Sequence, residues 1–281
     1  MRATRARPSR PHEWLQVDCS LFHEAPAKPY IPWARLLDAV EAWRAGGLID
    51  RFWFVRKPPG LRLRFQASSR AAAFQSELST WLLDAEQRND IRGFRFTVYE
   101  PETHRFGGVV GMDLAHTLFD AAATLPLQFH ANGAAPLRGL EVSIATTTNL
   151  LGRCLDDTAE AWDVWCRLYD AIPTLKVGAK SETELCNACF TGVQALAEAL
   201  GESWAPLLDN VSAAHDHVGR GLCALSRAGA LRVGLRGWLV AATIFDWNRF
   251  GLPNALDELK WGVECMKRSL APDGEGVRLR F

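Results

Sequence analysis

The stretch "VYEPETHRFGG", Val98–Gly108, places several ionisable side chains in one short turn. A tyrosine can donate a proton at an apolar site and a glutamate can accept one, so Tyr99, Glu100 and Glu102 are candidate catalytic residues. Arg105 completes the group as a cation that can stabilise a developing negative charge. Two glycines then let the chain turn into a helix whose N-terminal amides can hold an anion. The alternative is a capping turn closed by an internal Glu–Arg pair, and the pattern leaves both interpretations open.

A second candidate is the pair of arginines in "LRLRF", Leu61–Phe65. Side chains alternate along a strand, so Arg62 and Arg64 lie on the same face. Two neighbouring guanidiniums favour an anion between them, which makes this pair a candidate substrate-binding clamp for a carboxylate, a peptide carbonyl or an oxyanion. Alternation of this kind more often marks a solvated strand face, and the pattern alone favours that interpretation.

A third candidate is the end of a helix at "TIFDWNRFGLP", Thr243–Pro253. Asp246 and Arg249 are three positions apart and can form an ion pair, while the following glycine can end the helix. This structural interpretation is strong. The functional alternative makes Asp246 a proton acceptor and lets Trp247, Asn248 and Arg249 contact substrate, across a cleft from the arginines of the first half.

Two further motifs predict no metal site. "CNAC" at Cys186–Cys189 has no second cysteine pair to complete a zinc site and lies in a helical pattern, so core packing is favoured. The histidines of "HDH", His215–His217, point apart on a helix. The glycine-rich signatures that cradle nucleotide phosphates are missing from the sequence, and we expect no cofactor.

Composition excludes some classes of protein. The 281 residues include 32 Lys+Arg and 32 Asp+Glu, so the chain lacks the basic surplus that general nucleic-acid binding requires. We find no secretory signal and no apolar run long enough to span a membrane, and we expect a cytoplasmic protein whose seven scattered cysteines are reduced. Eleven tryptophans against three tyrosines indicate an aromatic core or an aromatic groove for a ligand.

The predicted fold class is α+β, with a mixed or antiparallel N-terminal sheet and flanking helices that pack on a C-terminal helical layer. We expect residues 1–11 to form a disordered basic tail and residues 12–281 to form one domain, sheet-rich over 12–128 and helical over 138–270. A last strand at Val277–Phe281 is expected to return to the sheet. The predicted strands are Glu13–Phe22, Ile49–Lys57, Leu61–Ser68 and Gly93–Pro101; the predicted helices are Trp33–Gly47, Arg70–Gln87 and Gly107–Leu125, with a loop over Leu125–Pro136.

Three segments in this order, "FWFVRKPPGLRLRF", "VYEPETHRFGGVVGMDLAHTLFDA" and "FDWNRFGL", resemble the C-terminal domain of class I lanthipeptide dehydratases. That glutamate-elimination module also occurs alone as the thiopeptide-type bacteriocin biosynthesis protein. The resemblance implies that the strand arginines, Arg105 and the Asn248-Arg249 pair contact a peptide. The eliminating enzymes also use a histidine just before the Asn-Arg pair, and Thr243–Trp247 holds none.

The missing histidine makes the chain most similar to the thiopeptide pyridine synthases of the same fold. These enzymes join two dehydroalanines by a formal aza-[4+2] cycloaddition, with loss of water and of the leader peptide. The implied partner is a ribosomally made precursor peptide with a leader and a dehydrated, azole-containing core, together with other maturation enzymes. Two alternatives remain: the elimination half of a split dehydratase, with Asp246 or His104 as base, and a non-catalytic protein that binds the precursor.

Overall fold

The computed structural model describes residues 14–21, 33–133, 136–173, 198, 200–201, 204–252 and 256–271. These residues fall into two compact units, Met1–Tyr99 and Glu100–Phe281. The expectation that both belong to one domain stays a prediction. The basic tail, the Cys186–Cys189 motif and the expected strand Val277–Phe281 lie outside the described residues.

The first unit is a four-stranded antiparallel sheet with two helices. Its elements are β1 (Trp14–Ser20), α1 (Trp33–Ala45), β2 (Ile49–Lys57), β3 (Gly60–Ala67), α2 (Ala71–Gln87) and β4 (Gly93–Thr97). The strand order is β2-β3-β1-β4, and every neighbouring pair is antiparallel. The consecutive strands β2 and β3 thus form a hairpin, and the predicted α+β class is confirmed.

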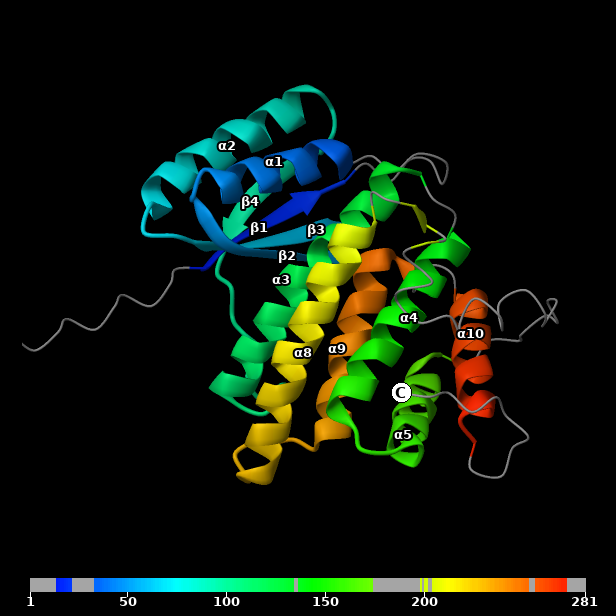
Figure 1. The fold of residues 1–281 in the computed structure, drawn as a ribbon. Helices are drawn as coiled ribbons and strands as arrows, with labels where there is room; N and C mark the ends of the chain where they lie inside the picture. Colours follow the sequence, from blue (N-terminus) through cyan, green and yellow to red (C-terminus); the bar gives the residue numbers. More distant parts are fainter. Residues whose placement is uncertain are drawn as a thin grey trace, which may run out of the picture. The chain divides into compact units, whose positions relative to one another are not determined.

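One face of this sheet is covered by α1 and α2, as Figure 1 shows. The Trp43 ring of α1 packs edge-on against Phe65 of β3 and Phe74 of α2, with ring centroids 5.7 and 5.4 Å apart. These three side chains are buried, as the helical spacing of Leu36, Leu37, Val40 and Trp43 in the sequence predicts. Because side chains alternate, the opposite face carries the polar residues of β1 and β3.

The second unit is entirely helical in its described part. Its helices are α3 (Val109–Ala131), α4 (Pro136–Cys154), α5 (Thr158–Ala171), α8 (Ala205–Arg227), α9 (Leu235–Phe250) and α10 (Leu256–Ser269). Helix α3 packs against α8 and α9, α4 packs against α8, α9 and α10, and α5 packs against α9 and α10 (Figure 1). Helix α9 therefore has neighbours on several sides, which explains why half of its residues are buried.

The predicted loop over Leu125–Pro136 is wrong, because α3 continues through Pro126 as far as Ala131. A proline inside a helix removes a backbone hydrogen bond and costs about 3 kcal/mol or more. Leu125, Leu127 and Phe129 are all buried here, and burying each such side chain contributes about 1.5–3 kcal/mol. Packing thus outweighs the local penalty. No helix in the described part of the chain has the length and apolar character needed to cross a bilayer.

Candidate functional site

Arg64 is the most constrained of the predicted site residues in the first unit. Antiparallel pairing places it between Gln16 of β1 and Trp53 of β2. Its Nε donates to Gln16 Oε1 at 2.8 Å, and its guanidinium lies 4.2 Å from the Trp53 ring centroid and 4.6 Å from that of Tyr99. Arg64 is only 7% exposed, so the interpretation of this strand face as solvated is wrong for Arg64. Cation–π contacts and a hydrogen bond to an amide together hold its charge in one orientation.

Arg62, two residues earlier, is held by a carboxylate. Its Nε lies 3.5 Å from Asp18 Oδ1, and Arg95 Nη2 lies 3.3 Å from Asp18 Oδ2. Gln16 Nε2 and Thr97 Oγ1 also donate to Asp18 Oδ1, each at 3.2 Å. Asp18 is therefore an internal counter-ion for this sheet face, a role that sequence spacing alone does not reveal.

Tyr99 lies just after β4 and is buried, with 9% exposure. Its ring meets Trp14 and Trp53 edge-on, at centroid distances of 5.2 and 5.9 Å. Aromatic neighbours of this kind fix a phenol ring while leaving its hydroxyl as the polar group of the cluster. The first unit therefore assembles Arg64, Tyr99 and two tryptophans on the sheet face opposite its helices.

The turn after Tyr99 belongs to the second unit and contains an ion pair. Arg105 Nη1 lies 3.2 Å from Glu102 Oε2, and both side chains are about two-fifths exposed. The internal Glu–Arg pair is therefore present, and no side-chain hydrogen bond caps α3 at Gly108. Glu100 and His104 are exposed. The Arg105 guanidinium also lies 5.5 Å from the Phe245 ring centroid, so the turn contacts helix α9.

The two glycines of the turn are required by its backbone. Gly107 and Gly108 have φ values of 76° and 114°, which side-chain-bearing residues rarely adopt. Arg232 N donates to Gly107 O at 3.1 Å, which fastens the turn to the segment before α9. A Cβ atom at Gly111 would lie 1.9 Å from Phe106 O, so the first turn of α3 also depends on glycine.

Asp246 and Arg249 form the predicted i, i+3 pair of α9, with Arg249 Nη2 3.2 Å from Asp246 Oδ1. Ser143 of α4 donates to Asp246 Oδ2 at 2.8 Å. Burial raises the pKa of the Asp246 carboxyl, and Arg249 and the Ser143 hydroxyl partly oppose that rise. Arg249 is 1% exposed, and its guanidinium lies 5.0 Å from the Phe119 ring centroid. Both charged groups are thus directed into the helical unit.

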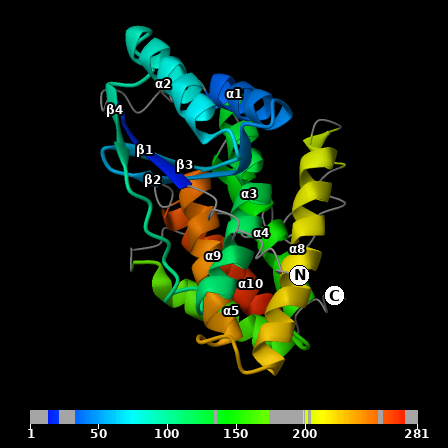
Figure 2. The same cartoon turned by 90° about the vertical axis from the view of Figure 1, so that its left-hand side faces the viewer.

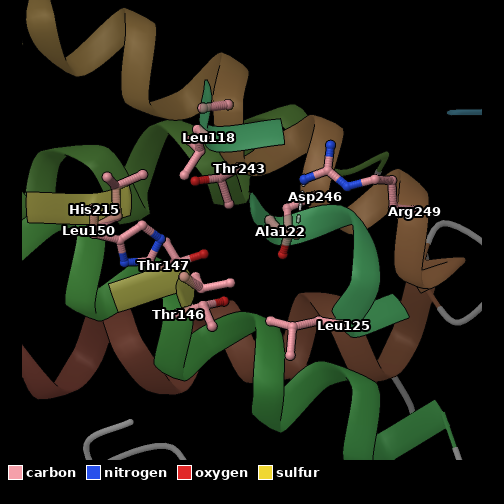
Figure 3. Close-up of a pocket in the computed structure, with 12 residues that line it drawn as sticks. Leu118, Ala122, Leu125, Thr146, Thr147, Leu150, His215, Thr243, Asp246 and Arg249 are labelled. Atoms are coloured by element: carbon pink, nitrogen blue, oxygen red, sulfur yellow. Dashed lines mark hydrogen bonds and ion pairs between the residues drawn. The ribbon is translucent and has the colours of Figure 1, made fainter. Parts of the chain in front are cut away.

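A small cavity lies beside this pair (Figure 3), with a volume of about 20 Å³. It is lined by Leu118, Ala122, Leu125, Thr146, Thr147, Leu150, Val211, His215, Ala242, Thr243, Asp246 and Arg249. A cavity of this size has room for about one water molecule. It is too small to hold a peptide. Trp247 is likewise buried, at 3% exposure, whereas Asn248 is partly exposed.

His215 of α8 lines the same cavity. The sequence motif was interpreted only in terms of metal binding, so this buried position was not predicted. Its Nδ1 lies 2.7 Å from Asn149 Oδ1. An amide oxygen only accepts, so Nδ1 carries the proton and Nε2 is left as an acceptor. Burial, aided by the charge of Arg153, lowers the pKa of His215 to about 3. In the sequence, His215 lies four residues after Val211 and three before Val218, which places it on the buried side of an amphipathic helix. This spacing could have predicted that His215 is buried.

No group of three His, Cys, Asp or Glu side chains within the described ranges is arranged to hold a metal ion. His217 is exposed whereas His215 is buried, in line with the expectation that the two rings point apart.

Comparison with solved structures shows which fold this is. The chain is similar to the crystal structure of the tRNA dependent lantibiotic dehydratase MibB from Microbispora sp. 107891, with a TM-score of 0.64 and 15% sequence identity. The similarity covers 93% of this chain but only 28% of that one. No curated protein sequence matches.

A match to a protein-family model shows the family of this chain. The model of the lantibiotic biosynthesis dehydratase C-terminal family matches residues 21–259, which is most of the chain. The chain therefore belongs to this family, as the sequence resemblance predicts.

Proposed function

We propose that the protein is a peptide cyclase that catalyses a formal aza-[4+2] cycloaddition between two dehydroalanines of a precursor peptide. The observation that carries this proposal is the state of Asp246 in α9. Eliminating members of the family have a histidine in this part of the helix, and here the ionisable group is a carboxylate bound by Ser143 and Arg249 beside a cavity of about 20 Å³. A base so enclosed is poorly placed to remove the α-proton of a peptide.

Cycloaddition requires fewer catalytic groups from the protein than elimination does. One dehydroalanine, with the preceding amide as its imidic acid tautomer, is the 2-azadiene, and the other dehydroalanine is the dienophile. Two C–C bonds form, then the hydroxyl leaves as water and the leader leaves as its amide, which gives a pyridine without an oxidant. Holding the reacting ends together can supply about 7–11 kcal/mol of the barrier.

The sheet face of the first unit supports this chemistry. The Arg64 guanidinium contacts the rings of both Trp53 and Tyr99, so its N–H groups are pre-oriented to hold a peptide carbonyl. We assign Tyr99 as the acid that protonates a leaving group, and Arg62 as a second contact to the peptide. Trp14 and Trp53 supply flat surfaces for azole rings.

In the second unit, we assign Glu100 to proton transfer because it is exposed. Glu102 holds Arg105 for contact with a peptide carbonyl. Asp246 acts by positioning Arg249 within α9, and Trp247 and Asn248 extend this region. The expectation that these groups and the sheet face contact one peptide stays a prediction.

The second candidate function is glutamate elimination, which the family's description as a dehydratase C-terminal domain favours. Arg62, Arg64 and Arg105, the arginines that the resemblance implies for elimination, are present in the sequence. Mass spectrometry separates the two functions. A dehydrated, azole-containing precursor should lose water and its leader and gain a pyridine chromophore if the protein is a cyclase. A glutamylated precursor should lose glutamate if it is an eliminating enzyme, and binding without any mass change would exclude both.

A further inference from the structure

The first unit contains a groove of about 480 Å³ whose lining includes Arg62 but neither Arg64 nor Tyr99. It is bordered by the end of β1, the β2–β3 turn and the start of β4. Three cationic side chains, Lys57, Arg62 and Arg95, line it together with one carboxylate, Asp18. Its volume lies within the range of about 300–1,000 Å³ that is typical of ligand sites.

The charges in this groove do not balance. Asp18 is shared, with Oδ1 3.5 Å from Arg62 Nε and Oδ2 3.3 Å from Arg95 Nη2. Gln16 and Thr97 each donate to Oδ1 as well, so the carboxylate has little capacity left. Among the residues that the structure describes, Lys57 forms no ion pair, which leaves two positive charges in surplus. A second anion beside these side chains would be attracted to them.

The shape of the groove favours an extended peptide over a small ion. Among the described strands β4 lies at the edge of the sheet, as the strand order and Figure 2 show, so its outer main-chain groups pair with none of these strands. An extended segment can pair with such an edge while its side chains enter the adjacent groove. Phe94 and Leu61 add apolar surface beside the cations, and the Arg95 side chain is 75% exposed and accessible.

We propose that this groove binds an extended, acidic segment of the precursor peptide, with Lys57, Arg62 and Arg95 facing its carboxylates. The proposal rests on the proposed function in so far as the peptide is a precursor. It adds a docking site on β4 and the β2–β3 turn that anchors the peptide away from the reacting residues.

Fluorescence anisotropy tests the groove directly. The probe is a short fluorescein-labelled peptide rich in glutamate, compared with a peptide in which each glutamate is replaced by glutamine. We expect the acidic peptide to bind more tightly and to lose affinity as salt rises to about 0.15 M and beyond. The double variant K57E/R95E should weaken its binding about tenfold, since each exposed ion pair contributes modestly. The control is R88E, a charge reversal of the same kind at the C-cap of α2, outside the groove.

Equal binding of both peptides, equal binding of a single-stranded oligonucleotide, or wild-type affinity in K57E/R95E would overturn the proposal. A K57E/R95E protein that still unfolds like wild type shows that a loss of binding is local. The assay is independent of turnover. Tight acidic-peptide binding with no conversion of any precursor would therefore support the docking groove and refute the proposed function. Conversion of a precursor without groove-dependent binding would support the proposed function and refute the docking groove.

Discussion

The neutral, buried imidazole of His215 predicts a defined loss of stability in acid. Its pKa is lowered to about 3 by burial and by the nearby charge of Arg153, which pairs with Asp216 at 3.2 Å. In the unfolded chain a histidine titrates near 6.5. Because the folded pKa is the lower one, the contribution to stability is present above pH 6.5 or so and is lost as pH falls toward 3. Arg249 and Asp246 line the same cavity as His215.

The size of the effect follows from the two pKa values. Each pH unit between them corresponds to about 1.4 kcal/mol, so His215 should cost the wild-type protein roughly 2.5 kcal/mol between pH 7 and about pH 4.5. His215→Asn removes the titration and keeps a donor for Asn149. We therefore expect urea unfolding to show a shallower acid dependence in His215→Asn, with the two stabilities converging or crossing as pH falls.

The matched control is His217→Asn, because His217 is exposed on the same helix. It should keep the acid dependence of the wild-type protein. Parallel pH profiles for wild type and His215→Asn would refute the reasoning, since they would mean that His215 is not buried as a neutral group.

Further substitutions test other parts of the structure. Gly111→Ala should lower the unfolding free energy strongly, because its Cβ would lie 1.9 Å from a backbone oxygen. The Cβ of Gly237→Ala meets nothing within 4 Å, so this substitution should stabilise the protein by about 0.5–1 kcal/mol. Equal effects of the two substitutions in thermal unfolding would contradict the backbone described for α3. Gln16→Leu should cost about 1–3 kcal/mol in urea unfolding, because it removes the acceptor of Arg64 Nε, and an unchanged midpoint would be inconsistent with that hydrogen bond. Tyr99→Phe should slow precursor conversion about a hundredfold without unfolding the protein, and wild-type turnover would remove Tyr99 as the proton donor.

Much of the fold follows from local pattern. The spacing of Leu36, Leu37 and Val40 is sufficient to predict α1, and the alternation of Leu61–Phe65 beside a proline-rich turn is sufficient to predict the β2–β3 hairpin. The loop predicted around Pro126 is wrong because the penalty of a proline inside a helix is local and visible in the sequence. The compensating burial of Leu127 and its neighbours depends on tertiary packing.

The candidate site was predictable by residue type and less so by environment. The Asp246–Arg249 pair is local and could be read from the sequence, but its partner Ser143 is 103 positions away. Strand register decides that Arg64 is enclosed by Trp53 and Tyr99 and is not solvated, and no short motif encodes that register. Likewise, His215 gains its role only from Asn149, 66 positions away.

The proposed cyclase activity is tested most directly by incubating the protein with its dehydrated, azole-containing precursor and following the products by mass spectrometry and absorbance. The account predicts a released leader amide and a core peptide that has lost water and absorbs as a pyridine. A core that keeps its leader and its mass, or one that changes only by losing glutamate from a glutamylated precursor, would contradict it.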